Sequence, residues 1–275
     1  MKEDNKDKTW KDKTGRKYQS YGAEQRLERE NLEEQEEKLD EVAAVAKETS
    51  NSKNIHLAIA EIPPSKSSSP HLHLNCESAI YVLAGEGIFV AGKKLDKHNK
   101  IKEGDFIYVP PDAPHKPINI SNKNPLLLLV ARNQPTEIVQ EIKDENELSK
   151  NFKQNNECTV IHSQCTENKS SETQKVNIGV SKNTSNSKAI YMSKIELSPG
   201  ISTIPHKHSD SETAVFINSG KGLFISNNKL DSHISISKED FIYIPEKLNH
   251  KLSNIDSNNS LSLIIARNNT DHNIL

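Results

Sequence analysis

Eight side chains in this sequence have the types and spacing of a metal site that occurs twice. Each half carries an H-x-H pair, a glutamate four residues later and a distant third histidine, and the two sets are about 135 residues apart. Three imidazoles and one carboxylate suit divalent transition metals, with Fe or Mn favoured and Ni, Cu or Zn as alternatives. We therefore expect up to two ions per chain. The candidate ligands are His71, His73, Glu77, His115, His206, His208, Glu212 and His250.

Strand geometry explains how such a set could converge. Side chains two residues apart on a strand point to the same face, so His71 and His73 can share one metal while Leu72 points away. His115 must come from another strand. Glu77 could complete the set, tune the charge of the metal or swing away to act as a base, so it is the candidate catalytic residue.

The similarity between the halves extends well beyond the candidate ligands. Residues 49–53 and 184–188 are identical, and Ala131-Arg132-Asn133 recurs as Ala266-Arg267-Asn268. Each copy is about 90 residues long, which is the size of a domain. The sequence therefore indicates a duplicated domain.

Short runs of β-branched and aromatic residues, such as 79–83, 106–109 and 126–130, alternate with glycine and proline turns. This pattern favours a barrel or sandwich. The charged start predicts a mobile tail to about residue 22 and a helix over 23–39, and a second helix is expected over 135–148. The predicted division is an extension over 1–41, a first domain over 42–134, a linker over 135–176 and a second domain over 177–275.

Two motifs in each half resemble those of the cupin superfamily. The pattern G-x5-H-x-H-x3/4-E-x6-G is matched in both halves, although Ser65 replaces the first glycine and the closing Gly85 and Gly220 fall one residue late, which suggests a bulge. A second cupin motif carries the distant histidine, and in the second half Glu239 and Lys247 replace both of its glycines. The first half matches that motif, G-x5-P-x-G-x2-H-x3-N, at Gly104, Pro110, His115 and Asn119, with Asp112 in place of its second glycine.

The resemblance implies an all-β chain with two antiparallel jelly-roll (cupin) barrels in tandem, preceded by a helical or disordered extension. The first half also resembles small uncharacterised prokaryotic cupins. For function, the resemblance implies a metal-dependent oxidoreductase similar to dioxygenase bicupins. Two alternatives stay open: a lyase or isomerase similar to oxalate decarboxylase or a sugar isomerase, and a non-catalytic ligand-binding or sensor protein.

Composition narrows the partners. The formal charge is −2 and no basic stripe occurs, so nucleic acid is not expected. The longest apolar run, 126–131, is too short to span a bilayer, and the charged N-terminus does not resemble a signal peptide, which predicts a cytoplasmic protein. We expect a small-molecule substrate or ligand, no membrane partner and, from the resemblance, a homo-oligomer. Arg132 and Arg267 are expected in ion pairs or interface contacts.

Overall fold

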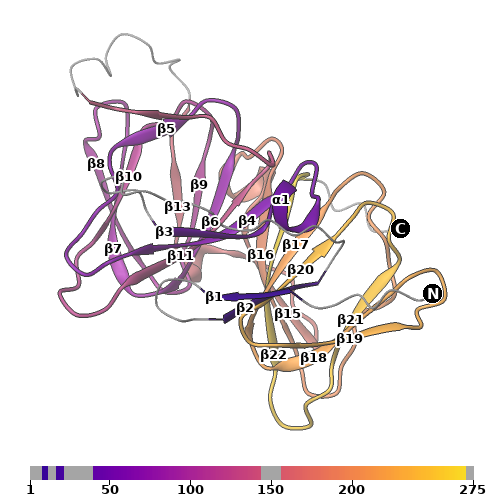
Figure 1. Ribbon diagram of the computed structural model, residues 1–275. Helices are drawn as coiled ribbons and strands as arrows, with labels where there is room; N and C mark the ends of the chain where they lie inside the picture. The colour runs from indigo at the N-terminus through magenta and orange to yellow at the C-terminus, as the bar shows by residue number, and fades with distance from the viewer. Residues whose placement is uncertain (1–7, 12–16, 22–39, 144–155, 271–275) are drawn as a thin grey trace.

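The computed structural model describes residues 8–11, 17–21, 40–143 and 156–270. Figure 1 shows two β-rich bodies side by side, the first half of the chain forming one and the second half the other. Nearly all strand pairs are antiparallel, and the described helices are single turns. The predicted all-β fold with two barrels in tandem is confirmed.

The first barrel consists of two facing sheets. One has the strand order β13-β9-β6-β11-β4-β3 and the other has the order β12-β5-β10-β7-β8. The strands are β3 (Asp40–Val45), β4 (His56–Ile62), β5 (His71–His73), β6 (Ser78–Ala84), β7 (Glu86–Ala91), β8 (Lys97–Lys102), β9 (Phe106–Val109), β10 (His115–Asn119), β11 (Leu126–Arg132), β12 (Val139–Glu141) and β13 (Thr159–Ile161).

The second barrel repeats this plan with an eight-stranded sheet, β1-β2-β20-β17-β22-β16-β15-β14, and a three-stranded sheet, β19-β18-β21. Single-turn helices α1 (Lys47–Ser50) and α2 (Lys182–Ser185) occupy equivalent places, and a 3₁₀ turn, η2, spans Ser163–Cys165. The strands are β1 (Lys8–Lys11), β2 (Lys17–Tyr21), β14 (Glu167–Asn168), β15 (Gln174–Val180), β16 (Tyr191–Leu197), β17 (Thr213–Ser219), β18 (Lys221–Ser226), β19 (Ser232–Ser237), β20 (Asp240–Ile244), β21 (His250–Asn254) and β22 (Leu261–Arg267).

The large sheets are buried on both faces, which explains why their strands are continuous apolar runs. On β11, Leu128 and Val130 join the core inside the first barrel. The alternate residues Leu129 and Ala131 join a different core that contains side chains from both halves. The two barrels therefore share a third hydrophobic core where their large sheets meet.

Several segments that were predicted to lie outside the barrels contribute strands to them, including the later part of the linker, where β13 pairs with β9 and β14 pairs with β15. Two others were expected to have a different structure. Residues 8–11 and 17–21, expected to be a mobile tail, form β1 and β2, and β2 pairs in parallel with β20. Residues 135–143, expected to begin a helix, contain β12, which pairs with β5. In both places a sheet edge offers unpaired backbone N–H and C=O groups. The hydrogen bonds gained by pairing with that edge outweigh the low strand preference of the segment's residues. The predicted helix over 23–39 lies outside the described residues.

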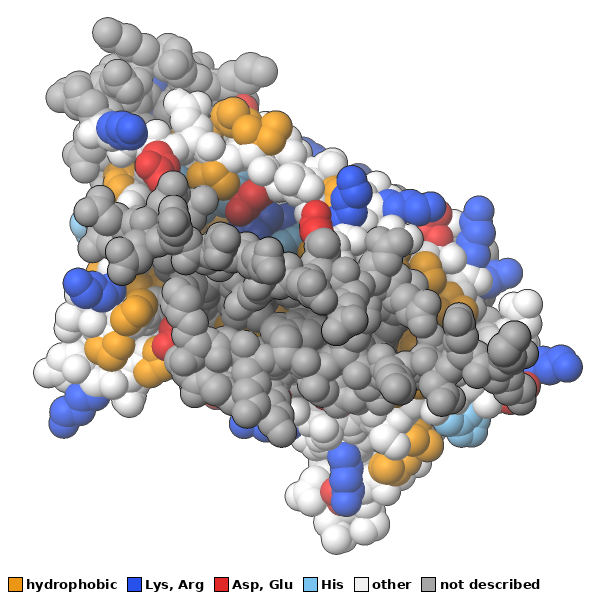
Figure 2. Space-filling model, in the orientation of Figure 1, with side chains coloured by type: hydrophobic (Ala, Val, Ile, Leu, Met, Phe, Trp, Pro, Cys, Tyr) orange, Lys and Arg blue, Asp and Glu red, His pale blue; other side chains and the backbone are white. Residues whose placement is uncertain are grey.

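The late closing glycines coincide with irregular pairing in both halves. The register between β6 and β11 shifts beside Leu83, and that between β17 and β22 shifts beside Asn218. One extra residue is accommodated there, so the suggested bulge is confirmed. No helix in the described ranges has the length and apolar character needed to cross a bilayer. On the face shown in Figure 2, the described Lys and Arg side chains are scattered and interspersed with acidic ones.

Candidate metal centres

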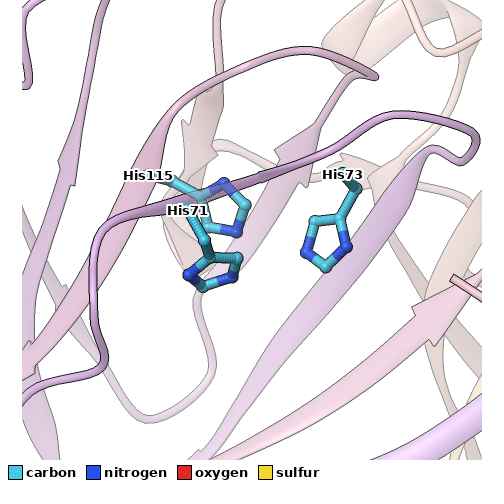
Figure 3. A group of neighbouring side chains, drawn as sticks. All are labelled: His71, His73 and His115. Atoms are coloured by element: carbon cyan, nitrogen blue, oxygen red, sulfur yellow. The ribbon is translucent and has the colours of Figure 1, made fainter. Parts of the chain in front are cut away.

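Three histidines from two neighbouring strands meet in the first barrel. His71 and His73 lie on β5, His115 lies on β10, and His115 pairs directly with His71. One ring nitrogen from each lies within 4.8 Å of the others. Figure 3 shows the three rings gathered around a common space. The H-x-H pair therefore acts as its spacing predicts, with both rings on one face of the strand.

The second barrel brings together the equivalent three residues. His206, His208 and His250 also offer nitrogens within 4.8 Å of one another. A β-bridge joins His206 to His250, although no regular strand corresponds to β5 in this half. The rings of His206 and His250 are 4.4 Å apart, compared with 4.3 Å for His71 and His115. The six predicted histidines therefore form two similar triads.

Backbone carbonyls fix the tautomer of two histidines in each triad. Nδ1 of His71 lies 2.8 Å from the carbonyl oxygen of Ser69, and Nδ1 of His115 lies 2.9 Å from that of Ala113. Nδ1 of His206 and Nδ1 of His250 make the same type of contact, at 2.8 and 2.9 Å. Because a carbonyl only accepts, Nδ1 carries the proton and the Nε2 lone pair is left for a metal.

Burial keeps these imidazoles in the form that binds metal. It is the largest influence on each ring, lowering the pKa of His71 and His206 and holding the pKa of His115 well below its ordinary value. Burial also lowers the pKa of His250 to about 4. Neutral rings at neutral pH have free lone pairs, so both triads suit a divalent transition metal.

The two predicted glutamate ligands lie elsewhere, which corrects the predicted ligand sets. The carboxylate of Glu77 accepts hydrogen bonds from the backbone N–H groups of Lys188 and Ala189, at 2.8 to 3.2 Å. The carboxylate of Glu212 accepts hydrogen bonds from those of Lys53 and Asn54, at 2.7 to 3.1 Å. Each glutamate thus binds the opposite half of the chain, and the structure gives no support for Glu77 as a base.

This exchange explains the identity of residues 49–53 and 184–188. In each copy an asparagine, Asn51 or Asn186, ends the single-turn helix in the left-handed region, with φ near 57° and 59°. The next residues then present their N–H groups to the glutamate of the other half. Hydroxyl groups hold the loop, since Ser52 donates to the carbonyl of Ile55 at 2.6 Å and Ser187 donates to that of Ile190 at 2.7 Å. The two loops are docking loops between the barrels.

A buried charged cluster, absent from the sequence-based prediction, lies beside the first triad. The guanidinium of Arg132 donates two hydrogen bonds to the carboxylate of Glu41, at 2.6 and 3.0 Å. Its Nε lies 2.7 Å from the Glu137 carboxylate, which also lies 2.8 Å from Nδ1 of His73. The expected ion pair at Arg132 is confirmed. Glu137 belongs to the stretch before β12 that was predicted to be helical, so no sequence signal placed it here.

The charges of this cluster stabilise one another. Burial by itself would raise the pKa of Glu41, but the charge of Arg132 and hydrogen bonds from His56 and Arg132 leave it well below its ordinary value. Burial would likewise lower the pKa of Arg132, but the charge of Glu41 and hydrogen bonds to it raise it. Both groups are therefore ionised at neutral pH.

A cupin domain model matches residues 58–132, which contain the whole first triad. The second barrel repeats this arrangement with a triad of its own. Residues 58–132 form a cupin domain, and the chain as a whole has the fold of a bicupin.

Similar proteins extend this result. An uncharacterised protein of Methanocaldococcus jannaschii is 38% identical over 80 residues, which are 29% of the bicupin chain and 60% of that relative. The match thus covers less than two thirds of the relative's length.

Solved structures with the same fold include oxalate decarboxylases. That of Lactobacillus farciminis, in a formate complex, has a TM-score of 0.70 at 15% identity and covers 88% of this chain and 85% of its own. The Bacillus subtilis enzyme, studied for its Mn(II) centres, has a TM-score of 0.68 at 17% identity, covering 86% and 74%. At these identities the likeness concerns the fold.

Proposed function

We propose that this bicupin is a metal-dependent enzyme that acts on small molecules, most closely of the dioxygenase type, with Fe or Mn as the preferred metal. The observation that supports it is the geometry of the triads, in which the ring nitrogens of three histidines converge. A metal bound there would act as a Lewis acid or electron relay with positions open to a ligand and to oxygen. Since the ligand set carries no carboxylate, the full charge of the ion remains available to polarise a ligand.

The residues around the first triad have separate tasks in this proposal. The carbonyls of Ser69 and Ala113 orient the rings of His71 and His115, and the Glu137 carboxylate lies against Nδ1 of His73. A carboxylate on that nitrogen makes the imidazole a stronger donor. The proposal therefore places the working centre in the first barrel.

Metal analysis followed by an oxygen electrode tests the proposal. We expect two equivalents of Fe or Mn per chain and oxygen uptake in the presence of a metal-binding substrate of only a few heavy atoms. Oxygen uptake should disappear with His115→Ala and persist with His98→Ala, because His98 is exposed on β8 and lies outside the triads. A chain that binds no metal would contradict the proposal.

A second candidate is a lyase similar to oxalate decarboxylase, supported by the shared bicupin arrangement of the solved structures. Release of carbon dioxide without net oxidation would favour it. Tight ligand binding without turnover would favour a sensor or storage role.

A further inference from the structure

We propose that Glu41, Arg132 and Glu137 act together as a charge-balancing wall that disfavours anions at the first metal centre, so that its substrate is a small uncharged molecule. This inference rests on the proposed function, because it requires a metal at the first triad. It concerns which molecules the centre accepts and names Glu41 and Glu137 as specificity-determining residues.

The cavity beside the triad is small and largely apolar. Its volume is about 30 Å³, which leaves room for only a few heavy atoms. Apart from the histidines, Glu41 and Arg132 are its charged lining residues, and most of the others are aliphatic or aromatic, including Ile80, Phe89 and Leu128. A ligand that enters must therefore give up most of its hydration, which is costly for an ion without a partner of opposite charge.

The one guanidinium in that lining is already engaged by carboxylates. Nη1 and Nη2 of Arg132 bind Glu41, and Nε lies 2.7 Å from Glu137. An anionic ligand would have to displace one of these contacts to reach Arg132. Two carboxylates face one guanidinium, and the other contact of Glu41 is with Nε2 of His56 at 2.9 Å. The charge of Arg132 is therefore already balanced, and none of it is left to attract an anionic ligand of the metal. Such a wall weakens the attraction between the metal and carboxylate ligands and leaves the binding of uncharged ligands unaffected.

Within the described residues of the second barrel, no acidic side chain occupies the position that corresponds to Glu41. The residues at the positions of Glu41 and His56 are Val176 and Tyr191, as the pairing of β15 with β16 shows. The guanidinium of Arg267 lies over the ring of Tyr191, 5.6 Å from its centre. Glu41 on β3 therefore has no acidic counterpart on β15. The second centre can thus serve as an internal comparison for the effect of Glu41 on anion binding.

Formate and formamide form a matched pair of probes, because they are nearly equal in size and differ by one charge. The full-length chain with His206→Ala and His250→Ala, which silences the second centre, is loaded with Co(II), and its visible spectrum is titrated with each probe. We expect Glu137→Gln to raise the affinity for formate about tenfold, since it removes one negative charge beside the metal, and to leave the affinity for formamide unchanged. Glu86→Gln, on an exposed position of β7, should change neither.

Two further measurements secure the test. Glu41→Gln should raise the affinity for formate as well, provided that its melting curve shows a folded protein. In the otherwise unmodified chain, the first centre should bind formate roughly tenfold more weakly than the second centre, which is isolated with His71→Ala and His115→Ala. This comparison does not require that either glutamate variant folds.

The outcomes separate the two proposals. The inference is overturned if cobalt-loaded Glu137→Gln and Glu41→Gln bind formate no more tightly than the parent chain, or if the first centre binds formate more tightly than the second. The proposed metal centre is unaffected by either result. If the first triad takes up no cobalt, the proposed function fails and the inference fails with it.

Discussion

At the scale of single residues, the two kinds of predicted ligand have different roles. The histidines converge because residues two apart on β5 share a face and β10 is its neighbour. Glu77 and Glu212, a few residues further on, are drawn to pairs of N–H groups in the opposite half. Charge-assisted hydrogen bonds to these partly buried amides compete with metal ligation for the same carboxylate oxygens.

This difference can be tested by comparing one histidine with one glutamate. His115→Ala should reduce the metal content from two equivalents to one, because two imidazoles hold the ion poorly. Glu77→Gln should leave two equivalents bound and lower the free energy of unfolding by about 2 kcal/mol, since the amide keeps the shape but loses the charge. Elemental analysis and urea unfolding measure both effects. Loss of one equivalent in Glu77→Gln would show that this glutamate is a ligand after all.

The buried imidazoles also predict how the stability of the metal-free protein depends on pH. Their folded-state pKa values lie below that of a free histidine, near 6.5, so the unfolded chain binds more protons in the interval between the two. The free energy of unfolding therefore falls as the pH drops below about 6.5, by up to about 1.4 kcal/mol per pH unit for each such histidine. For His250 the fall continues to about pH 4.

Urea titrations of the metal-free chain at pH 7, 6, 5 and 4 measure this dependence. His250→Asn should flatten the curve between pH 6.5 and 4, because it removes one of the depressed groups. The same protonation should release bound metal from the second centre only as the pH approaches 4, the pKa of His250. A stability that is unchanged from pH 7 to 4 would contradict the assignment of buried neutral imidazoles.

At the scale of elements, the sequence predicted what depends on local spacing and missed what depends on pairing with distant edges. The repeat and the strand runs around 79–83, 106–109 and 126–130 correspond to β6, β9 and β11. The strand β12 was missed because its residues are polar and its partner, β5, lies more than 60 residues earlier. Glu137 was missed for the same reason, since it reaches His73 and Arg132 only when this segment folds back over the barrel.

The contact between strands β9 and β15 offers a test of how closely the elements pack. A Cβ atom on Gly179 of β15 would lie 2.0 Å from the ring of Phe106 on β9. Gly179→Ala should therefore lower the free energy of unfolding by about 1 to 3 kcal/mol, because the ring is buried and has little room to move. Gly179 has no positive φ, so backbone strain does not contribute.

A double-mutant cycle with Phe106→Leu separates this clash from other effects. Adding Gly179→Ala to Phe106→Leu should cost less than adding it to the parent chain, because the smaller side chain leaves space for the methyl group. Equal costs in both backgrounds would show that the effect of the alanine does not arise from Phe106.

At the scale of the whole molecule, three hydrophobic cores make one folding unit. One core lies inside each barrel, and the third contains Tyr81 and Phe106 from the first half together with Phe216 and Phe241 from the second. The exchanged glutamates lie at the same junction. A barrel separated from its partner would expose one face of its large sheet, so neither half is expected to retain its stability alone.

The shared core predicts that the two barrels unfold together. Calorimetry of the full chain should give a single transition, with the van't Hoff enthalpy equal to the calorimetric enthalpy. Metal should raise the midpoint, because it binds the folded state and stabilises it in proportion to the logarithm of its concentration over Kd. Replacing both Glu77 and Glu212 by alanine should lower the midpoint and reduce the agreement between the two enthalpies, since the docking loops then lose their partners. Two separate transitions in the parent chain would show instead that each barrel is stable by itself and that the shared core contributes little.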